Sequence, residues 1–180
     1  MGNISDMMEQ VKISSQGVIA FITNPSKTRF LIQRKDSGYK HANQHRTICF
    51  FGGHVESKET PLEAIKREVL EEIGHQPTVE VIVAYLDSWS KSCNVLLKSM
   101  VLESENNPGT FYELFMFEVI VPDEVLNAIE KVLYEPEIIL EGYGEIVSRA
   151  YLDFIADKHP ADFFSSLAES YRKYSLSEIF

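Results

Sequence analysis

The chain has 180 residues, of which 44% are hydrophobic and 24% charged, and these ordinary globular values exclude a disordered or collagen-like chain. Its 27 acidic residues against 17 basic ones give a formal charge of −10, which repels polyphosphate backbones, so we expect no nucleic acid partner. The polar segment 1–12 lacks a signal-peptide core, and no apolar run is long enough to span a membrane. Cys49 and Cys93 lack the spacing of a disulfide framework or a zinc site. We therefore expect a cytoplasmic protein without membrane association.

The N-terminal part of the chain predicts a hairpin followed by a short strand. Gly17–Ile22 and Arg29–Arg34 are rich in apolar and β-branched residues, and the turn-forming Asn24–Ser26 lies between them. Thr47–Phe51 then predicts a strand that stops at Gly52-Gly53.

One helix has a clear start signal in the sequence. Thr60 is suited to cap its N-terminus, Pro61 to occupy its first position, and Glu63 to complete a capping box. We expect this helix to run to about Ile73 and to stop at Gly74 through a left-handed turn.

The remaining elements complete a mixed pattern of strands and helices. We expect strands at Thr78–Leu86, Asn94–Leu102, Thr110–Val121 and Tyr143–Val147. We expect one helix from Pro122 to Leu133 and a second over Arg149–Asp157, capped by Ser148. A last helix should begin at Pro160, because Phe163, Leu167, Tyr171 and Tyr174 recur at helical spacing. This order predicts an α+β fold, an α/β/α sandwich with a mixed sheet between helices. We expect residues 1–148 to form the main domain, with 149–180 as a C-terminal helical extension packed on it.

The helix after Gly52-Gly53 carries three glutamates on one face. At helical spacing Glu68, Glu71 and Glu72 lie together beside the apolar stripe that faces the core. Their mutual repulsion grows near the core, where the dielectric constant falls, and a hard divalent cation such as Mg²⁺ would relieve it.

A plain salt-bridge ladder is the alternative interpretation of this acidic helix. Glu63, Arg67 and Glu71 follow each other at i,i+4 spacing and could pair on a solvated face. The preceding Gly52-Gly53 favours the metal site, because glycines let the backbone turn sharply beside the carboxylates and expose a carbonyl.

The same segment resembles the Nudix box, the signature motif of the Nudix hydrolase family. The residues that match at the family's spacing are Gly53, Glu59, Arg67, Glu68, Val69, Glu71, Glu72 and Gly74. His75 departs from the pattern, since the family has an aliphatic residue there, and this questions local packing more than chemistry.

The resemblance implies a Nudix-type mixed sheet and a loop–helix–loop that holds Mg²⁺ or Mn²⁺ over a diphosphate. It implies that the metal is bound by Glu68, Glu71, Glu72 and the Gly52 carbonyl, that these glutamates and Arg67 form the catalytic set, and that Gly53, Glu59 and Gly74 are structural. It does not settle which glutamate is the general base.

Three residues outside the box are further candidates. Arg34 ends a strand and could contact a substrate phosphate, although an exposed loop charge is the simpler explanation for any single cation before the box. Glu113 and Glu118 lie on a later strand, where some Nudix enzymes place an additional metal ligand or base, and a polar outer strand face explains them equally well.

These features together predict a Mg²⁺-dependent pyrophosphohydrolase that cleaves a nucleoside diphosphate linked to another moiety. The family markers for ADP-ribose and NADH are missing, and the segment around Gly53 weakly favours a nucleoside triphosphate or a nucleotide sugar as the small nucleotide-type substrate. A non-catalytic nucleotide sensor and a diphosphate isomerase of the same fold, which would use Cys49 or Cys93, remain alternatives, and a homodimer is left open.

Overall fold

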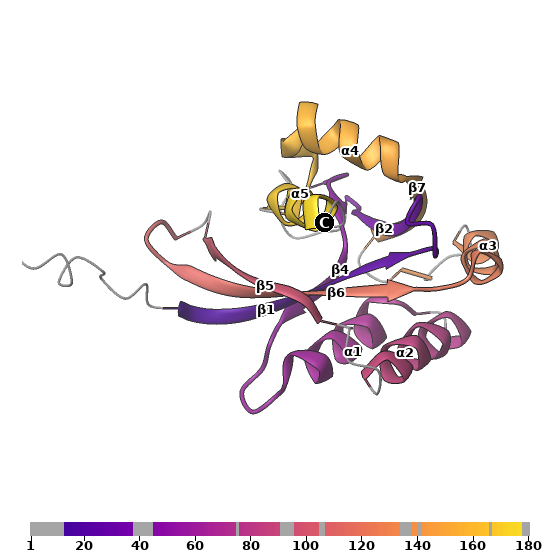
Figure 1. Ribbon diagram of the computed structural model, residues 1–180, viewed down its shortest axis with the longest axis horizontal. Helices are drawn as coiled ribbons and strands as arrows, with labels where there is room; N and C mark the ends of the chain where they lie inside the picture. Colours follow the sequence, from indigo (N-terminus) through magenta and orange to yellow (C-terminus); the bar gives the residue numbers. More distant parts are fainter. Residues whose placement is uncertain are drawn as a thin grey trace, which may run out of the picture.

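The computed structural model describes residues 13–37, 45–74, 76–90, 96–104, 107–133, 138–139, 142–165 and 167–177 (Figure 1). Its strands are β1 (Ile13–Thr23), β2 (Arg29–Lys35), β3 (Ile48–Cys49), β4 (Phe51–His54), β5 (Leu96–Glu103), β6 (Phe111–Ile120) and β7 (Gly142–Ser148). Its helices are α1 (Pro61–Glu72), α2 (Gln76–Ser90), α3 (Asp123–Val132), α4 (Arg149–Lys158), the short 3₁₀ helix η3 (Pro160–Asp162) and α5 (Leu167–Ser177). None of the helices in these ranges is long and apolar enough to cross a bilayer.

The strands of the described ranges form one mixed seven-stranded sheet. The order along the sheet is β3-β2-β1-β6-β5, with β4 also paired to β1 and β7 to β2. β1 and β6 run parallel, whereas the other pairs are antiparallel. The predicted hairpin of β1 and β2 is confirmed, and so is the mixed sheet.

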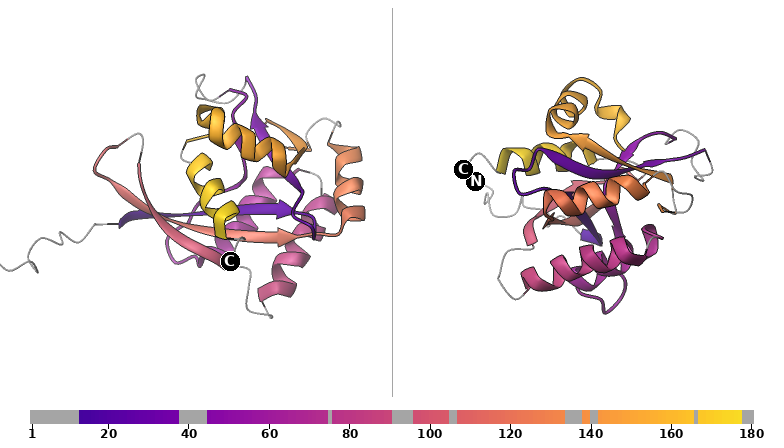
Figure 2. Two further views of the ribbon diagram at one scale, coloured as in Figure 1. Left: turned by 45° about the horizontal axis from the view of Figure 1, so that its top comes forward. Right: turned by 90° about the vertical axis from the view of Figure 1, so that its right-hand side faces the viewer.

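Helices cover both faces of this sheet, as Figures 1 and 2 show, with α1 and α2 on one side and α4 and α5 on the other. Side chains of β1 alternate between the two layers, as a pleated strand requires. Ala20 packs in the apolar cluster that includes Ile65 of α1, and Phe21 packs in the cluster that includes Tyr171 and Tyr174 of α5. The α/β/α sandwich predicted from the order of elements is thus confirmed.

The strand predicted at Thr47–Phe51 forms as two short strands with different partners. Ile48–Cys49 pairs with β2, whereas the following segment pairs with β1, opposite Gly17–Ala20. The prediction that this strand stops at Gly52-Gly53 is wrong, because β4 runs through both glycines to His54. β1 therefore changes its antiparallel partner from β4 to β2 along its length, and the loop before α1 starts at the far end of β4, after His54, which lies opposite Gly17.

Helix α1 starts as its sequence predicts and ends by a different mechanism. The Thr60 side chain accepts a hydrogen bond from the Glu63 backbone, and the Glu63 side chain accepts one from the Thr60 backbone, so the capping box is present. At the other end Ile73 is extended, with φ −106° and ψ 108°, and pairs with Ile139. The Gly74 N–H donates to the Ile138 carbonyl, so strand-like pairing ends the helix where we expected a left-handed glycine.

The segment predicted as a strand at Thr78–Leu86 is helical, and that prediction is wrong. Its run of β-branched residues favours a strand locally, but local propensity is weaker than tertiary packing. Val79 and Ile82, three residues apart, are buried in the same cluster as Ile65 and Val69 of α1. Packing of one helical face against α1 therefore decides the conformation of α2.

The C-terminal part follows the predictions for α4 but not for the last helix. Ser148 caps α4 by accepting a hydrogen bond from the Tyr151 backbone, as expected. The helix predicted to begin at Pro160 is only the short turn of η3 there, and α5 begins at Leu167. Phe163 lies between them because it pairs with Ile48 at the edge of β3 and is buried.

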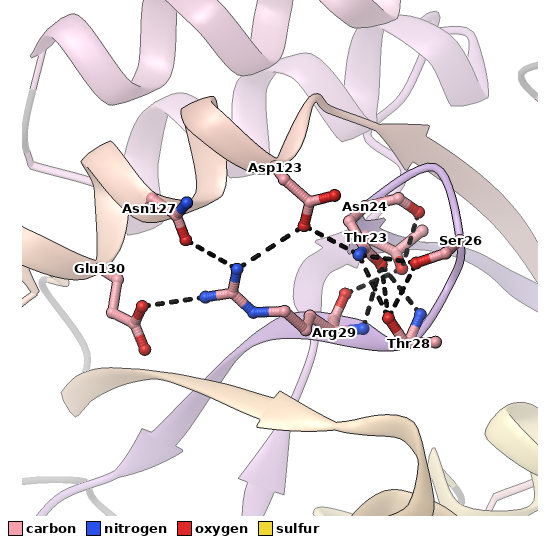
Figure 3. A network of polar contacts seen from close by, with 8 residues as sticks. All are labelled: Thr23, Asn24, Ser26, Thr28, Arg29, Asp123, Asn127 and Glu130. Atoms are coloured by element: carbon pink, nitrogen blue, oxygen red, sulfur yellow. Dashed lines mark hydrogen bonds and ion pairs between the residues drawn. The ribbon is translucent and has the colours of Figure 1, made fainter.

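A polar network at the β1–β2 turn joins the sheet to α3 (Figure 3). The buried Asn24 accepts a hydrogen bond from the Thr28 backbone at 2.9 Å and donates to Asp123 at 2.9 Å. Arg29 donates to Glu130 of α3 at 2.9 Å. These contacts satisfy a buried amide, which would otherwise be costly, and fix α3 at this end of the sheet.

Candidate active site

Arg67 joins the loop before α1 to the acidic face of that helix. Its Nε and Nη2 donate to the two carboxylate oxygens of Glu59 at 3.0 Å each, and Nη2 also donates to the His54 carbonyl at 2.8 Å. Nη1 donates to both Glu68 and Glu71 at 2.9 Å. One guanidinium therefore fixes the loop and brings two of the three predicted metal ligands to the same nitrogen.

The charges of this network stabilise each other. The hydrogen bond to Glu59 raises the pKa of Arg67, and the bond to Glu68 adds to this effect. The hydrogen bond from Arg67 lowers the pKa of the Glu59 carboxyl, and a backbone bond from Glu56 lowers it further. Glu59 is therefore ionised at neutral pH, in agreement with a structural role.

Glu72 is buried and held on both of its oxygens. Its side chain is only 7% exposed. The Gly52 N–H donates to Oε2 at 2.9 Å, Gln33 donates to Oε1 at 2.8 Å, and the Lys35 ammonium lies 3.7 Å from Oε1. A buried carboxylate requires such compensation. These partners fix Glu72 beside Gly52, near the start of β4.

The two glycines before α1 are required for different reasons. The Glu68 carboxylate lies so close to Gly53 that an added Cβ would be 2.4 Å from it. Gly52 has φ +151°, and a Cβ there would lie 2.1 Å from the Val18 carbonyl oxygen. The first contact is with a flexible side chain and the second with backbone. Gly53 thus makes room for the Glu68 carboxylate, whereas Gly52 makes room for the sheet.

The oxygen donors at this corner fit a hard divalent cation. Glu68 occupies the space left by Gly53, and Glu72 is fixed beside Gly52. In the part of the chain that the structure describes, no three acidic, histidine or cysteine side chains already converge on one point. Mg²⁺ uses one or two carboxylates together with water and substrate phosphates, so it needs no such preformed cage.

A pocket lies on the opposite side of the same two glycines. It has a volume of about 270 Å³, and Gly17, Phe50, Gly52, Gly53, Tyr112 and Phe164 are among the residues that line it. Most of the exposed lining is apolar. Gly52 and Gly53 therefore contact both the carboxylates and a pocket of suitable size for part of a small ligand.

Arg34 lies on the other face of β2 from the carboxylates. It donates to Glu145 at 2.6 Å and to the Tyr151 hydroxyl at 2.8 Å. Burial alone would lower the Arg34 pKa, but these two hydrogen bonds outweigh it and raise the pKa. The structure does not bring Arg34 together with the box glutamates.

Gln33 and Lys35 contact Glu72, and the sequence analysis did not single them out. They lie two and four residues after Leu31 and therefore on the same face of β2, and the Leu31 side chain packs in the cluster on the α1 side. Polar residues at two successive inward positions of a strand were the available signal, because inward positions are normally apolar.

The two strand glutamates lie on opposite faces of the sheet. Glu113 accepts a hydrogen bond from Gln16 at 3.0 Å, on the strand face that also carries Phe115 towards the α1 side. Gln16 accepts the Val55 N–H through its carbonyl, so Glu113 is near the loop before α1.

Glu118 belongs to the α5 side. It is 5% exposed, accepts a hydrogen bond from the Tyr174 hydroxyl at 2.6 Å, and lies 2.9 Å from the Lys27 ammonium. Its observed contacts attach α5 to the sheet. His75 lies outside the described residues.

Comparison with known families identifies the class of protein. The sequence profile of the NUDIX domain matches residues 14–135, which include the complete box and most of the sheet. The chain belongs to the Nudix family, and the resemblance seen in the sequence is confirmed. It is a hydrolase that acts on pyrophosphate bonds. No sequence among curated proteins matches it.

Solved structures support the fold. The MutT protein from Methanosarcina mazei Go1 is similar at a TM-score of 0.56 with 16% identity, covering 93% of this chain and 96% of that one. A NUDIX hydrolase from Nitrosomonas europaea is similar at a TM-score of 0.51 with 22% sequence identity, and the match covers 88% of this chain and 85% of that one. A third similar structure is the bifunctional NMN adenylyltransferase/ADP ribose pyrophosphatase of Francisella tularensis, complexed with AMP and a manganese ion. Its TM-score is 0.51 with 16% sequence identity, and the match covers 93% of this chain and 42% of that chain.

Proposed function

We propose that this protein is a Mg²⁺-dependent pyrophosphohydrolase that cleaves a nucleoside diphosphate linked to another moiety. The observation that carries the proposal is the meeting of Glu68 and Glu72 with the backbone of Gly52 and Gly53. The metal would be held by Glu68, Glu71, Glu72 and the carbonyl of Gly52. When bound, it supplies positive charge for the diphosphate and lowers the pKa of a bound water.

The protein's own residues set up this chemistry. Arg67 orients Glu68 and Glu71, and its pairing with Glu59 holds the loop in place. A general base must be within reach of water, and Glu68, whose side chain is 14% exposed, meets this condition better than Glu72, whose side chain is 7% exposed. Glu113, next to the loop, is a candidate for an additional ligand or base.

The substrate is a small nucleotide, and we favour a nucleoside triphosphate or a nucleotide sugar. The pocket beyond Gly52 and Gly53 would receive its organic part, while the diphosphate would lie toward the carboxylates. The Francisella tularensis protein is complexed with AMP and a manganese ion, the two kinds of ligand that this proposal assigns to the present protein. We further propose that the protein is cytoplasmic and has no nucleic acid partner.

A nucleotide panel with Mg²⁺, Mn²⁺ or EDTA tests the proposal. The panel includes nucleoside triphosphates, nucleotide sugars, ADP-ribose and NADH, and the products are resolved by chromatography. We expect metal-dependent release of a nucleoside monophosphate from at least one class. Tight binding of a nucleotide without release of a product would indicate a sensor. Isomerisation of an allylic diphosphate would indicate an isomerase, which could use Cys49 because this residue lines the pocket.

Substitution of the glutamates tests their roles. Glu72→Gln and Glu68→Gln should each lower turnover at least about a hundredfold, because each removes a negative charge that would hold the metal cation against the diphosphate. Glu130→Gln, on the remote helix α3, is the control and should retain activity. Near-full activity in both site variants would refute the assignment.

A further inference from the structure

A buried cation lies beside one of the predicted metal ligands. The Lys35 side chain is 4% exposed, and its ammonium lies 3.7 Å from Oε1 of Glu72. The Lys35 N–H donates to the Thr47 carbonyl at 3.3 Å, and the Lys35 carbonyl accepts from the Arg46 N–H at 2.7 Å. The ring of Phe164 lies 5.9 Å from the same ammonium. The end of β2 is therefore fixed by its backbone, and the long Lys35 side chain is enclosed with its charge toward Glu72.

Lys35 compensates the charge of Glu72 when no metal is bound. Gly52 and Gln33 also donate to this carboxylate, but each of them is a neutral dipole, whereas Lys35 contributes a full positive charge. A buried carboxylate without a countercharge is costly, so this ion pair stabilises the metal-free fold. A metal ion bound by Glu72 would consequently meet a carboxylate that already has a cation beside it.

The formal charge of the acidic cluster shows what this second cation does. The cluster contains four carboxylates and two cations: Glu59, Glu68, Glu71, Glu72, Arg67 and Lys35. Four negative charges against two positive ones leave a formal charge of −2, which one divalent metal ion cancels. Without Lys35 the cluster would attract the metal more strongly. A diphosphate would add negative charge to the neutralised cluster, and the Lys35 charge would then be favourable.

We propose that Lys35 is an internal counter-ion that keeps the affinity for a metal ion alone low and thereby couples metal binding to substrate binding. The proposal rests on the proposed function for the position of the metal, at Glu72. Lys35 acts through Glu72, so it is a positioning residue and not a catalytic one. Substrate should raise the affinity for the metal, and metal the affinity for the substrate, by the same factor, typically about 5- to 150-fold.

Metal binding without turnover tests this inference. The metal-free full chain is titrated with Mn²⁺ in the absence of nucleotide, and free Mn²⁺ is followed by electron paramagnetic resonance. Lys35→Met should bind Mn²⁺ at least about fivefold more tightly than wild type, the lower end of the usual range of coupling. Gln33→Leu removes a neutral donor from the same carboxylate and should weaken Mn²⁺ binding. If Lys35 only held Glu72 in place, Lys35→Met would also weaken it.

Further variants separate the charge of Lys35 from its packing. Lys35→Arg keeps the charge and should keep the weaker wild-type affinity. Lys35→Gln removes the charge but retains a hydrogen-bond donor for Glu72, so it should fold even if Lys35→Met does not, and it should also bind Mn²⁺ more tightly. Lys131→Met, on the exposed surface of α3, is the matched control and should change nothing. Mn²⁺ affinity at or below the wild-type value in Lys35→Gln would overturn the proposal.

The outcomes distinguish this inference from the proposed function. Mn²⁺ binding that Glu72→Gln weakens but the neutral Lys35 variants leave unchanged would support the metal site and refute the counter-ion. Mn²⁺ binding that none of these variants changes would refute both. Tighter binding in the Lys35 variants, together with no hydrolysis in the nucleotide panel, would support the counter-ion and refute the pyrophosphohydrolase.

The coupling itself is measured with methylenediphosphonate, a diphosphate that cannot be hydrolysed. Its affinity is determined by calorimetry with and without Mn²⁺ and corrected for the complex that the two form in solution. The ratio of the two affinities should be at least about fivefold in wild type and should fall toward one in Lys35→Gln. An equal ratio in both proteins would refute the coupling.

Discussion

Gly53 and Gly52 are adjacent, yet the structure predicts opposite consequences for their replacement. In Gly53→Ala the new methyl group would meet the Glu68 carboxylate, which can rotate away. A displacement of about 1 Å in a catalytic group can cost about 100-fold in rate, so we expect such a loss of kcat/KM. The free energy of unfolding should change by less than about 1 kcal/mol, measured by urea denaturation.

Gly52→Ala is the matched comparison. Its methyl group would meet the Val18 backbone oxygen at a left-handed φ, and neither can move without disturbing β1. We expect a loss of at least about 2 kcal/mol in unfolding free energy. Equal stability of the two variants would contradict this division of roles.

Gln33 is the second residue whose removal should affect function more than fold. The Gln33 amide nitrogen donates to Glu72 at 2.8 Å. Among the fully buried side-chain nitrogen and oxygen atoms in the described part of the chain, the Gln33 amide oxygen is the one without a hydrogen-bond partner. Gln33→Leu removes a hydrogen bond to the buried Glu72 carboxylate, which destabilises the fold, and also removes the unpaired oxygen, which opposes that loss. The free energy of unfolding should therefore fall by less than about 3 kcal/mol. Removing a group that orients a metal ligand usually weakens metal binding by about 10- to 100-fold, and we expect the affinity for Mg²⁺ to fall by about this factor.

The measurement for this variant is the Mg²⁺ dependence of turnover, with the unfolding midpoint followed in parallel. Gln76→Leu, on the exposed start of α2, is the control for replacing a glutamine by leucine. A wild-type Mg²⁺ dependence in Gln33→Leu would show that Gly52 and Lys35 suffice to hold Glu72.

At this scale the sequence predicts residue types better than it predicts side-chain direction. The box glutamates could be placed because a helix has a fixed period and a clear start at Thr60. The sequence predicts a site role for Arg34, but its neighbour Lys35 is the cation that lies 3.7 Å from Glu72. A one-residue step on a strand reverses the face, and nothing local sets which face a residue occupies.

At the scale of elements, Arg67 and Glu59 connect the loop to α1, and this connection predicts a pH effect. The Glu59 pKa is lowered in the fold from the reference value of 4.5 by its hydrogen bonds with Arg67. A lowered carboxyl pKa means that its stabilisation is present above the unfolded value and is lost as pH falls through the folded value. Stability contributed by Glu59 should therefore disappear below pH 4.5.

Thermal unfolding of wild type and Glu59→Gln between pH 3 and 7 checks this expectation. The difference in midpoint should be constant at neutral pH and shrink below pH 4.5. Repeating the pair in an Arg67→Gln background should reduce the pH-dependent difference, because only the backbone hydrogen bond from Glu56 then lowers the Glu59 pKa. A difference that grows toward low pH would contradict the pairing.

The elements that the sequence predicted wrongly share one cause. α2 was expected to be a strand because its residues favour one, and it is helical because Val79 and Ile82 pack against α1. Phe163 was expected in a helix because of its spacing, and it pairs instead with Ile48. Both outcomes depend on partners far away in the sequence, which no local pattern contains.

At the scale of the whole molecule, the C-terminal elements cover a large apolar surface of the sheet. Phe21, Phe30 and Phe50 are at most 1% exposed, and Tyr171 and Tyr174 of α5 pack on them. The order of strands and helices was enough to predict a layer here. It could not predict that the segment before α5 also closes the pocket, because that contact joins residues more than one hundred positions apart.

Removal of this layer should therefore cost the molecule its native state. A chain that ends at Ser148 would expose the aromatic face of the sheet to water, and an apolar patch of that size promotes association. We expect the truncated protein to aggregate, or to bind the dye ANS with loss of cooperative unfolding, as measured by light scattering, fluorescence and calorimetry.

Tyr174→Phe provides the graded comparison for this truncation. It keeps the ring against Phe21 but removes the hydroxyl that donates to Glu118 at 2.6 Å. Because Lys27 still faces that buried carboxylate, we expect a loss of about 1–3 kcal/mol with cooperative unfolding retained. A truncated chain that remains monomeric and unfolds as sharply as Tyr174→Phe would show that residues 1–148 fold alone, and that the C-terminal layer serves only the pocket.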